Sequence, residues 1–298
     1  MSKISHLQAH LYVLLATFLV AGSFIASQPL AKVINPFSLT LFRFLFSLLI
    51  LAPFILMQKN LRQKIVATLP RAMVISFFYS IYFMALFESL KTTTVLNTGT
   101  LYTLVPLITA VLAFFVFKEK ISLNKFLVYL IGLVGTLWVV FKANVALFLN
   151  FSLNFGDYIF LIGAFSMCCY SISLKYFYKQ DNIFVMVFCT LLGGCIWLGI
   201  ALLLLNQPLN WHLLQGDLLY NMLYLIIGTT IMTLYLYQKT TVILGPTKVM
   251  SYIYLNPIAV AILLYILNDE HVESIVFVGI MISALATLIL QKNTRSSN

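Results

Sequence analysis

The chain has 298 residues, of which 62% are hydrophobic and 9% are charged, whereas soluble domains carry about 25% charged residues. So few charged side chains cannot cover a water-facing surface, which excludes an ordinary soluble protein and indicates a chain that crosses a membrane several times. The net charge of +10 then reflects membrane topology and contact with anionic lipid, and it does not predict a nucleic-acid partner.

Apolar stretches of about 18–25 residues follow one another along the chain, each long enough for a helix across a hydrocarbon core of ~30 Å. A helix pairs its own backbone groups, which lipid cannot do, and the alternation typical of barrel strands is missing from the sequence. The first stretch is too long for a signal peptide and lacks a small-residue cleavage site, so we expect it to remain in the protein. Ten spans are predicted, at residues 11–31, 36–57, 71–90, 94–117, 122–141, 156–177, 182–205, 218–238, 245–267 and 272–290.

The cations are distributed unevenly between the loops. With a cytoplasmic N-terminus, fourteen Lys and Arg residues fall on the inner side, three fall on the outer side, and Arg43 lies within the second span. Cytoplasmic loops are rich in Lys and Arg, so this bias predicts that both termini are cytoplasmic. The inner cations are Lys3, Lys59, Arg62, Lys64, Arg71, Lys118, Lys120, Lys125, Lys175, Lys179, Lys239, Lys248, Lys292 and Arg295, and the outer ones are Lys32, Lys91 and Lys142.

Two segments 151 residues apart are nearly the same, since Leu-Val-Pro-Leu-Ile at 104–108 recurs as Leu-Asn-Pro-Ile-Ala at 255–259. At this offset Glu119 corresponds to Glu270, and toward the N-terminus an offset of 147 pairs Lys32 with Lys179. Each copy holds five predicted helices, and an odd number makes the second copy enter the membrane from the opposite side. The chain is therefore predicted to be an all-α membrane protein of two inverted five-helix repeats, with its substrate site near the midplane between them. The first repeat is 1–142, an external linker is 143–155, and the second repeat with a short cytoplasmic tail is 156–298.

Three groups of residues resemble a known family. They are Ala21-Gly22-Ser23-Phe24 leading to Lys32, Leu39 leading to Arg43-Phe44-Leu45, and a fourth span with Pro106 that ends in Glu119. Their order and spacing resemble the drug/metabolite transporter superfamily, EamA type, over nearly the whole chain. The resemblance implies a secondary carrier, often an exporter, in the bacterial inner membrane, for amino acids, metabolites, nucleoside-like compounds or cations. The sequence departs from the family pattern at Ala21, Val128 and Ala286, so helix contacts there are expected to differ.

The two prolines of the repeat are expected to kink their helices. A proline lacks an N–H, so Pro106 frees the carbonyl of Tyr102 and Pro257 frees that of Ile253 near mid-membrane. Asn256 lies near the centre of its span, where an unpaired amide is costly, so its side chain is expected to face protein, water or ligand. Two interpretations of Asn256 remain open. Its side chain either bonds to a neighbouring helix beside the proline kink or binds the substrate.

Polar and aromatic side chains gather at the same predicted depth. Thr98 and Tyr102 are four residues apart, as are Tyr252 and Asn256, so each pair lies on one helix face. Two such faces meeting between the repeats would form a polar cleft with aromatic walls, suited to a neutral, zwitterionic or aromatic solute, although most tyrosines of a membrane protein belong to the interfacial belt. The candidate substrate-binding residues are Tyr79, Tyr82, Asn97, Thr98, Tyr102, Tyr170, Ser171, Tyr235, Tyr252 and Asn256.

Two cations near these segments are possible charge contacts. Arg43 is expected to extend toward the membrane surface, with binding of a substrate carboxylate as the alternative. Lys248 is expected to reach the cytoplasmic surface, with gating or anion contact as the alternative. Glu88 lies near the outer end of the third span, and neither a carboxylate nor a histidine is predicted at a midplane. We therefore expect a facilitative carrier or an exchanger that is not coupled through a buried carboxylate.

Other classes of function fit the sequence less well. An enzyme would need paired carboxylates, a metal-spaced His cluster or a nucleophile beside a base, but the histidines are scattered and the four cysteines fall inside spans as packing residues. We expect neither an enzyme nor a cofactor or metal. A channel would show large single-channel currents in place of saturable counter-exchange. The expected partners are a small-molecule solute and membrane lipid; nothing in the sequence decides the substrate, the direction of transport or the oligomeric state.

Overall fold

The computed structural model describes most of the chain. Several residues named above lie outside the described residues, namely Glu270, Lys3, Lys120, Lys142 and Arg295. The described residues are 5–93, 95–119, 121–141, 144–150, 153–268 and 276–292, and within these ranges the side chains of residues 95, 96, 261, 264, 267, 268, 276 and 292 are excluded.

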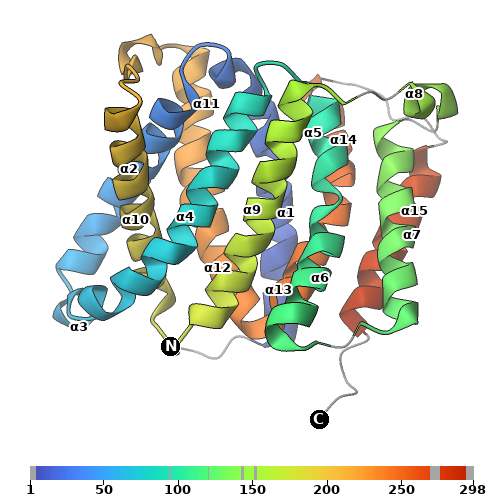
Figure 1. Ribbon diagram of the computed structural model, residues 1–298, viewed down its shortest axis with the longest axis horizontal. Helices are drawn as coiled ribbons and strands as arrows, with labels where there is room; N and C mark the ends of the chain where they lie inside the picture. Colours follow the sequence, from blue (N-terminus) through green and yellow to red (C-terminus); the bar gives the residue numbers. More distant parts are fainter. Residues whose placement is uncertain are drawn as a thin grey trace.

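The described residues form helices and turns, with no strand among them, and the helices run roughly parallel and antiparallel in one bundle (Figure 1). Helices are expected in lipid, because each helix pairs the hydrogen-bonding groups of its own backbone. The helices of the first half and the linker are α1 (His6–Ala31), α2 (Pro36–Leu56), α3 (Lys59–Arg62), α4 (Ile65–Ser89), α5 (Val95–Tyr102), α6 (Val105–Phe117), α7 (Leu123–Val140) and α8 (Val145–Leu149). Those of the second half are α9 (Phe155–Phe177), α10 (Ile183–Leu204), the 3-10 turn η1 (Trp211–Leu213), α11 (Asp217–Ile226), the π-helical segment η2 (Ile227–Met232), α12 (Thr233–Leu244), α13 (Pro246–Ser251), the 3-10 turn η3 (Tyr252–Leu255), α14 (Asn256–Asn268) and α15 (Val276–Lys292).

Eight helical segments of the described chain are long and apolar enough to cross a membrane, each with at least 18 residues. They correspond to the first eight predicted spans. The ninth predicted span is divided among α13, η3 and α14, and the tenth falls on α15, of which 17 residues are described. The count of ten spans and the cytoplasmic location of the termini therefore stay predictions.

The start of α1 and the end of α15 lie at the same edge of the bundle, which we call the terminal edge (Figure 1). Two contacts support this arrangement. Gln291 on α15 donates a hydrogen bond to the carbonyl of Lys248 at 3.1 Å, and His10 on α1 is close enough to Lys248 to interact with it electrostatically. The opposite edge carries the linker helix α8 and is called the linker edge.

Helix contacts follow the internal repeat. Helix α9 packs on α4, and its counterpart α1 packs on α11 and α12; likewise α9 packs on α6, and α1 packs on α14. Two further contacts pair counterparts with each other, namely α2 with α10 and α7 with α15. Exchanging the two halves maps these contacts onto one another, which fits repeats related by a pseudo-two-fold axis.

Helix starts also repeat between the halves. The side chain of Asn35 accepts the Ser38 N–H at 2.8 Å and caps α2, and Asn182, 147 residues later, accepts the Phe184 N–H at 2.9 Å and caps α10. An Asn at this position satisfies a backbone donor that the first helical turn leaves unpaired. The offset of 147 therefore holds for local structure as well as for residue type.

Both proline-containing helices are interrupted before the proline. A turn at Thr103 and Leu104 separates α5 from α6, which has Pro106 at its first turn. In the second half the 3-10 turn η3 separates α13 from α14, whose second residue is Pro257. The missing N–H of each proline and the clash of its ring with the preceding turn explain the position of each break.

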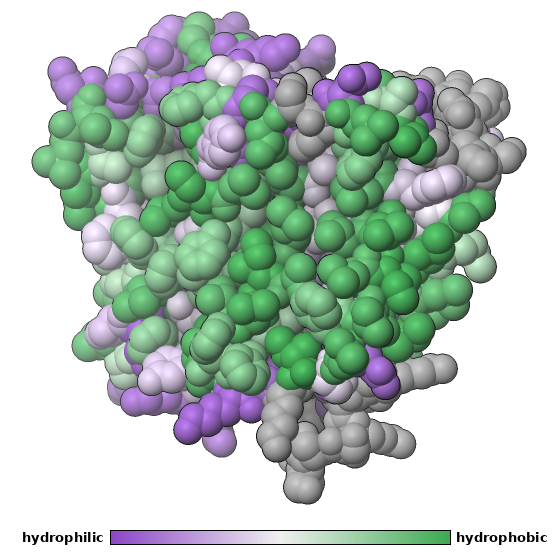
Figure 2. Space-filling view, turned by 45° about the vertical axis from the view of Figure 1, so that its right-hand side comes forward, coloured by the Kyte–Doolittle hydropathy of each residue, from purple (hydrophilic) through white to green (hydrophobic). Residues whose placement is uncertain are grey.

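The surface of the bundle is an apolar band with polar residues at both edges (Figure 2). Large hydrophobic side chains such as Phe54, Phe115, Ile131 and Phe165 point outward. The interior holds many small hydroxyl residues, including fully buried Ser47, Thr109 and Thr136. This is the distribution expected where lipid contacts the outside and small residues let helices approach one another.

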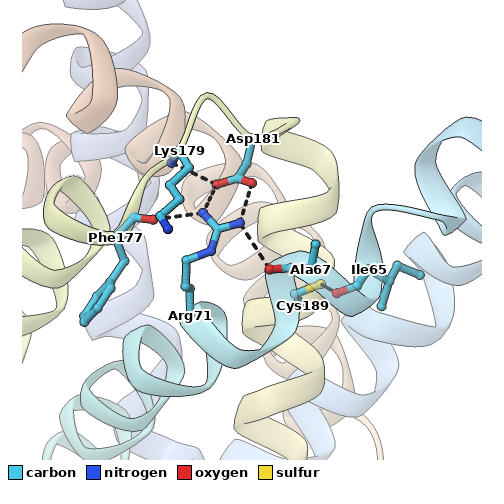
Figure 3. A network of polar contacts seen from close by, with 7 residues as sticks. All are labelled: Ile65, Ala67, Arg71, Phe177, Lys179, Asp181 and Cys189. Atoms are coloured by element: carbon cyan, nitrogen blue, oxygen red, sulfur yellow. Dashed lines mark hydrogen bonds and ion pairs between the residues drawn. The ribbon is translucent and has the colours of Figure 1, made fainter.

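An ion pair joins the two halves at the terminal edge (Figure 3). Arg71 at the start of α4 donates two hydrogen bonds to Asp181, at 2.7 and 2.9 Å, in the loop between α9 and α10. The same guanidinium donates to the carbonyls of Phe177 and Ala67 at 3.0 and 3.2 Å. A bidentate pair of this kind fixes direction as well as distance, so it anchors α4 to the second half.

The contact between α7 and α15 depends on glycine. A Cβ atom on Gly135 would lie 2.7 Å from Ser283 Oγ and 2.9 Å from the Ser283 backbone nitrogen, and one on Gly279 would lie 2.7 Å from the Gly135 carbonyl. Backbone atoms cannot yield as a flexible side chain can, so these glycines set the spacing of the two helices.

We expect Gly135→Ala to destabilise the purified protein by about 1–3 kcal/mol, because the added methyl group overpacks the α7–α15 contact. Gly199→Ala on α10 is the matched control, since nothing lies within 4 Å of its Cβ position. Thermal unfolding in detergent measures both variants, and equal midpoints for the two would contradict the close packing.

Candidate functional site

Aromatic rings fill the middle of the bundle between the two halves. Tyr79 on α4 lies 4.8 Å from Tyr170 on α9 and 4.9 Å from Phe83, measured between ring centroids. Tyr82 stacks on Tyr102 at 6.0 Å. These side chains are buried, and they come from helices of both repeats. The interior cluster consists of Phe24, Phe44, Tyr79, Tyr82, Phe83, Tyr102 and Tyr170.

Arg43 points from α2 into this cluster and is only 1% exposed. Its guanidinium carbon lies 4.1 Å from the centroid of the Phe83 ring, a cation–π contact. Its Nε donates to Thr230 Oγ1, and its Nη2 donates to the carbonyl and the hydroxyl of Thr229 at 3.0 and 2.8 Å. The third nitrogen, Nη1, is buried without a hydrogen-bond partner.

The helix that receives Arg43 is irregular at the point of contact. Residues Ile227–Met232 form a π-helical turn, in which hydrogen bonds span five residues and the turn is wider than in an α-helix. The Thr229 carbonyl accepts from Arg43, and the Ile226 carbonyl accepts from Ser47, also on α2, at 3.2 Å. The irregular turn therefore supplies acceptors to α2, and such turns are frequent at functional sites.

The prediction that Arg43 extends toward the membrane surface is wrong. The side chain is held inside the protein by three hydrogen bonds and by the face of the Phe83 ring. These contacts stabilise the buried position more than hydration of the guanidinium at the membrane surface would stabilise the extended one. Among the described residues, every hydrogen-bond partner of Arg43 is neutral. A buried guanidinium surrounded by neutral groups lacks a compensating anion, which is an expensive arrangement.

The structure brings together some of the residues that the sequence singled out. Tyr79, Tyr82, Tyr102 and Tyr170 belong to the interior cluster around Arg43. Ser171, next to Tyr170, is buried and its hydroxyl has no partner.

Other predicted residues lie outside the cluster. Tyr235 stacks on Phe184 at 4.7 Å and accepts from Lys239, while the hydroxyl of Tyr252 contacts His10 Nδ1 at 2.8 Å. Asn97 donates to Asp157 at 2.9 Å. Thr98 is buried on the same helix, α5, and Lys248 lies at the terminal edge near His10.

Asn256 occupies the break between η3 and α14, as the repeat predicted. It is 6% exposed, and neither its side-chain nitrogen nor its side-chain oxygen has a hydrogen-bond partner. An unpaired buried amide costs about 1–3 kcal/mol. Its counterpart in the first half, Val105, is apolar and buried, so the polar group is present in one repeat only.

One buried acid was not singled out from the sequence. Asp157 in the first turn of α9 is 0% exposed and accepts hydrogen bonds from Thr93, which precedes α5, and from Asn97 on α5. Glu88, by contrast, pairs with Lys91 near the surface at 2.7 Å. The spacing of Asn154 and Asp157, which form a capping box at the start of α9, was the available signal.

Within the described part of the chain, His, Cys, Asp and Glu residues form no group of three that could hold a metal ion. The four cysteines are free and buried or half-buried, and the thiol of Cys168 contacts the carbonyl of Ala164 at 3.2 Å. The thiols of Cys168 and Cys189 also contact carbonyls of neighbouring helices, those of Val105 at 3.6 Å and Ile65 at 3.8 Å, so these two cysteines pack between helices.

Comparisons with known proteins agree with this architecture. The model of the EamA-like transporter family matches residues 7–141 and 154–291, one match in each half. The chain therefore belongs to the EamA-like transporter family and is a multi-pass membrane protein. A solved crystal structure with 17% sequence identity covers 97% of this chain and 100% of its own, with a TM-score of 0.72, and so shares the fold. No curated protein matches the sequence significantly.

Proposed function

We propose that the protein is a secondary transporter in the bacterial inner membrane that moves a small organic metabolite, an amino acid or a related zwitterionic or aromatic solute. The observation that carries this proposal is Arg43, a buried guanidinium with neutral partners and a free Nη1 among tyrosines of both repeats. Family membership supports transport itself, and the interior cluster supports the kind of solute.

A carboxylate on the substrate would supply the negative charge that the neutral surroundings of Arg43 lack. Arginine recognises carboxylates through paired N–H groups, and a charge-assisted hydrogen bond in a site shielded from water is worth more than one at the surface. The free Nη1 is the donor available for this contact, while Nε and Nη2 stay on the π-helical turn.

The walls around this position suit an aromatic or zwitterionic body. Tyr79, Tyr82, Tyr102 and Tyr170 offer ring faces and hydroxyl groups within one cluster. Tyrosine rings bury large apolar area and attract cations at their faces, so they accept an ammonium group as readily as a ring. An S-adenosyl or nucleoside-like compound is the second candidate, favoured by the same stacked rings.

Alternating access follows from the paired contacts of the two halves. A site between inverted repeats can be exposed to either side of the membrane by rocking one half against the other. The interruptions before Pro106 and Pro257 divide α5 from α6 and α13 from α14, so the outer part of each helix can move without its inner part.

A thermal-shift screen of the purified protein against amino acids, nucleosides and S-adenosyl compounds tests the proposed substrate class. We expect stabilisation by a compound that carries a carboxylate, because binding to the folded state raises its stability. Stabilisation by neutral nucleosides alone would contradict the proposal.

Asn256→Ala is expected to weaken binding of that compound roughly tenfold, because it removes a buried amide that has no partner in the protein. Asn221→Ala on α11, at a half-buried position, is the matched control. Isothermal titration measures both variants, and unchanged affinity in Asn256→Ala would give this residue a structural role only.

We also expect transport without a proton driving force. In proteoliposomes, uptake of the compound found in the screen should saturate and show counter-exchange, with the same final level with and without an imposed pH gradient. Accumulation that depends on the pH gradient and is lost on changing an acidic residue alone would contradict a facilitative carrier.

A further inference from the structure

Two titratable residues occupy equivalent positions in the two halves. His10 lies on α1 and Asp157 on α9, and they are separated by the offset of 147 that also pairs the capping residues Asn35 and Asn182. Each residue comes from the first helix of its own half. His10 makes a hydrogen bond to Tyr252 in η3 of the second half, and Asp157 makes one to Asn97 in α5 of the first half.

At the linker edge Asp157 ties α9 to the start of α5. Its two carboxylate oxygens accept from the hydroxyl of Thr93 and, at 2.9 Å, from the amide of Asn97. The carboxylate is completely buried, and it also accepts the Asn154 N–H at 2.8 Å within its own capping box. The bonds to α5 cross between the halves, whereas the capping box is local.

At the terminal edge His10 joins α1 to the 3-10 turn η3, which follows α13. Its Nδ1 lies 2.8 Å from the hydroxyl of Tyr252, and the ring centroids of the two residues are 6.1 Å apart. Lys248, which corresponds to Asn97 at the offset of 151, is near enough to interact with the His10 ring electrostatically. Equivalent pairs of helices, α9 with α5 and α1 with α13 and η3, are thus joined at opposite edges of the bundle by different side chains.

We propose, on the basis of the proposed transport function, that Asp157 and His10 are the gate residues that close opposite ends of the substrate pathway. Each bonds to the segment before a proline break, α5 in one half and α13 with η3 in the other, and the two contacts lie at opposite edges (Figure 1). Both contacts are formed in this structure. During transport one contact opens while the other stays formed, because the halves rock about a common axis.

Hydrogen exchange in lipid nanodiscs tests this proposal without any substrate. Asn97→Ala removes a cross-half bond of Asp157 and leaves its capping box, and Tyr252→Phe removes the hydroxyl that contacts His10. We expect about five- to tenfold faster exchange at the edge where the bond was removed, as loss of one hydrogen bond would give. Exchange at the opposite edge should become slower, because opening one gate favours closure of the other. The peptides to follow are residues 95–102 and 246–255.

Tyr220→Phe is the matched control, since Tyr220 is exposed on α11, and it should change exchange at neither edge. Thr93→Val repeats the test at the linker edge if Asn97→Ala does not fold. Faster exchange at the altered edge alone, or at both edges together, would overturn the gate assignment. Neither result bears on the transport function, which the flux measurements test separately.

Discussion

The positive charge of Arg43 inside an apolar bundle is the constraint on which the central site depends. Burial of an unpaired ion costs several kcal/mol even after the protein relaxes, so a guanidinium among neutral groups must be supported by geometry. The support consists of the Phe83 ring, the two threonines of the π-helical turn and the carbonyl of Thr229. These contacts hold the side chain in place without neutralising it, so under the proposed function a substrate carboxylate would meet a donor that is already oriented.

The repeated halves offer the proposed transport cycle a way to reach such a site from two sides. Exchange of the halves maps the contact of α4 with α9 onto that of α11 and α12 with α1, while α2 and α10, like α7 and α15, pack on their own counterparts. A rocking motion of the halves would therefore have two end states with equivalent helix contacts. The residues at equivalent positions differ between the halves: Asn256 corresponds to Val105, and Asp157 corresponds to His10. Equivalent architecture with unequal side chains lets the two end states differ in free energy.

Much of the fold could be predicted from the sequence because the relevant signals are local. Apolar length predicted the positions of the first eight long helical segments, the shared offset predicted equivalent halves, and Pro106 and Pro257 predicted the helix breaks. The direction of Arg43 could not be predicted, since it depends on Thr229 and Thr230 in a distant helix and on a π-helical turn that has no sequence signature here. Asp157 was missed for the same reason: its partners Thr93 and Asn97 are brought to it by packing. Four of the ten candidate substrate-binding residues belong to the interior cluster around Arg43, whereas Tyr235, Tyr252 and Asn97 have partners elsewhere.

The most direct test of the central claim compares each amino acid that the protein binds with its carboxamide, which has the same shape and lacks the negative charge. Isothermal titration is done with the unaltered protein and with Arg43→Gln, as a double-mutant cycle. The account predicts that the unaltered protein binds the carboxamide at least roughly tenfold more weakly, and that Arg43→Gln binds both compounds about equally. Equal affinity of the unaltered protein for the acid and the carboxamide would contradict a carboxylate-binding role for Arg43.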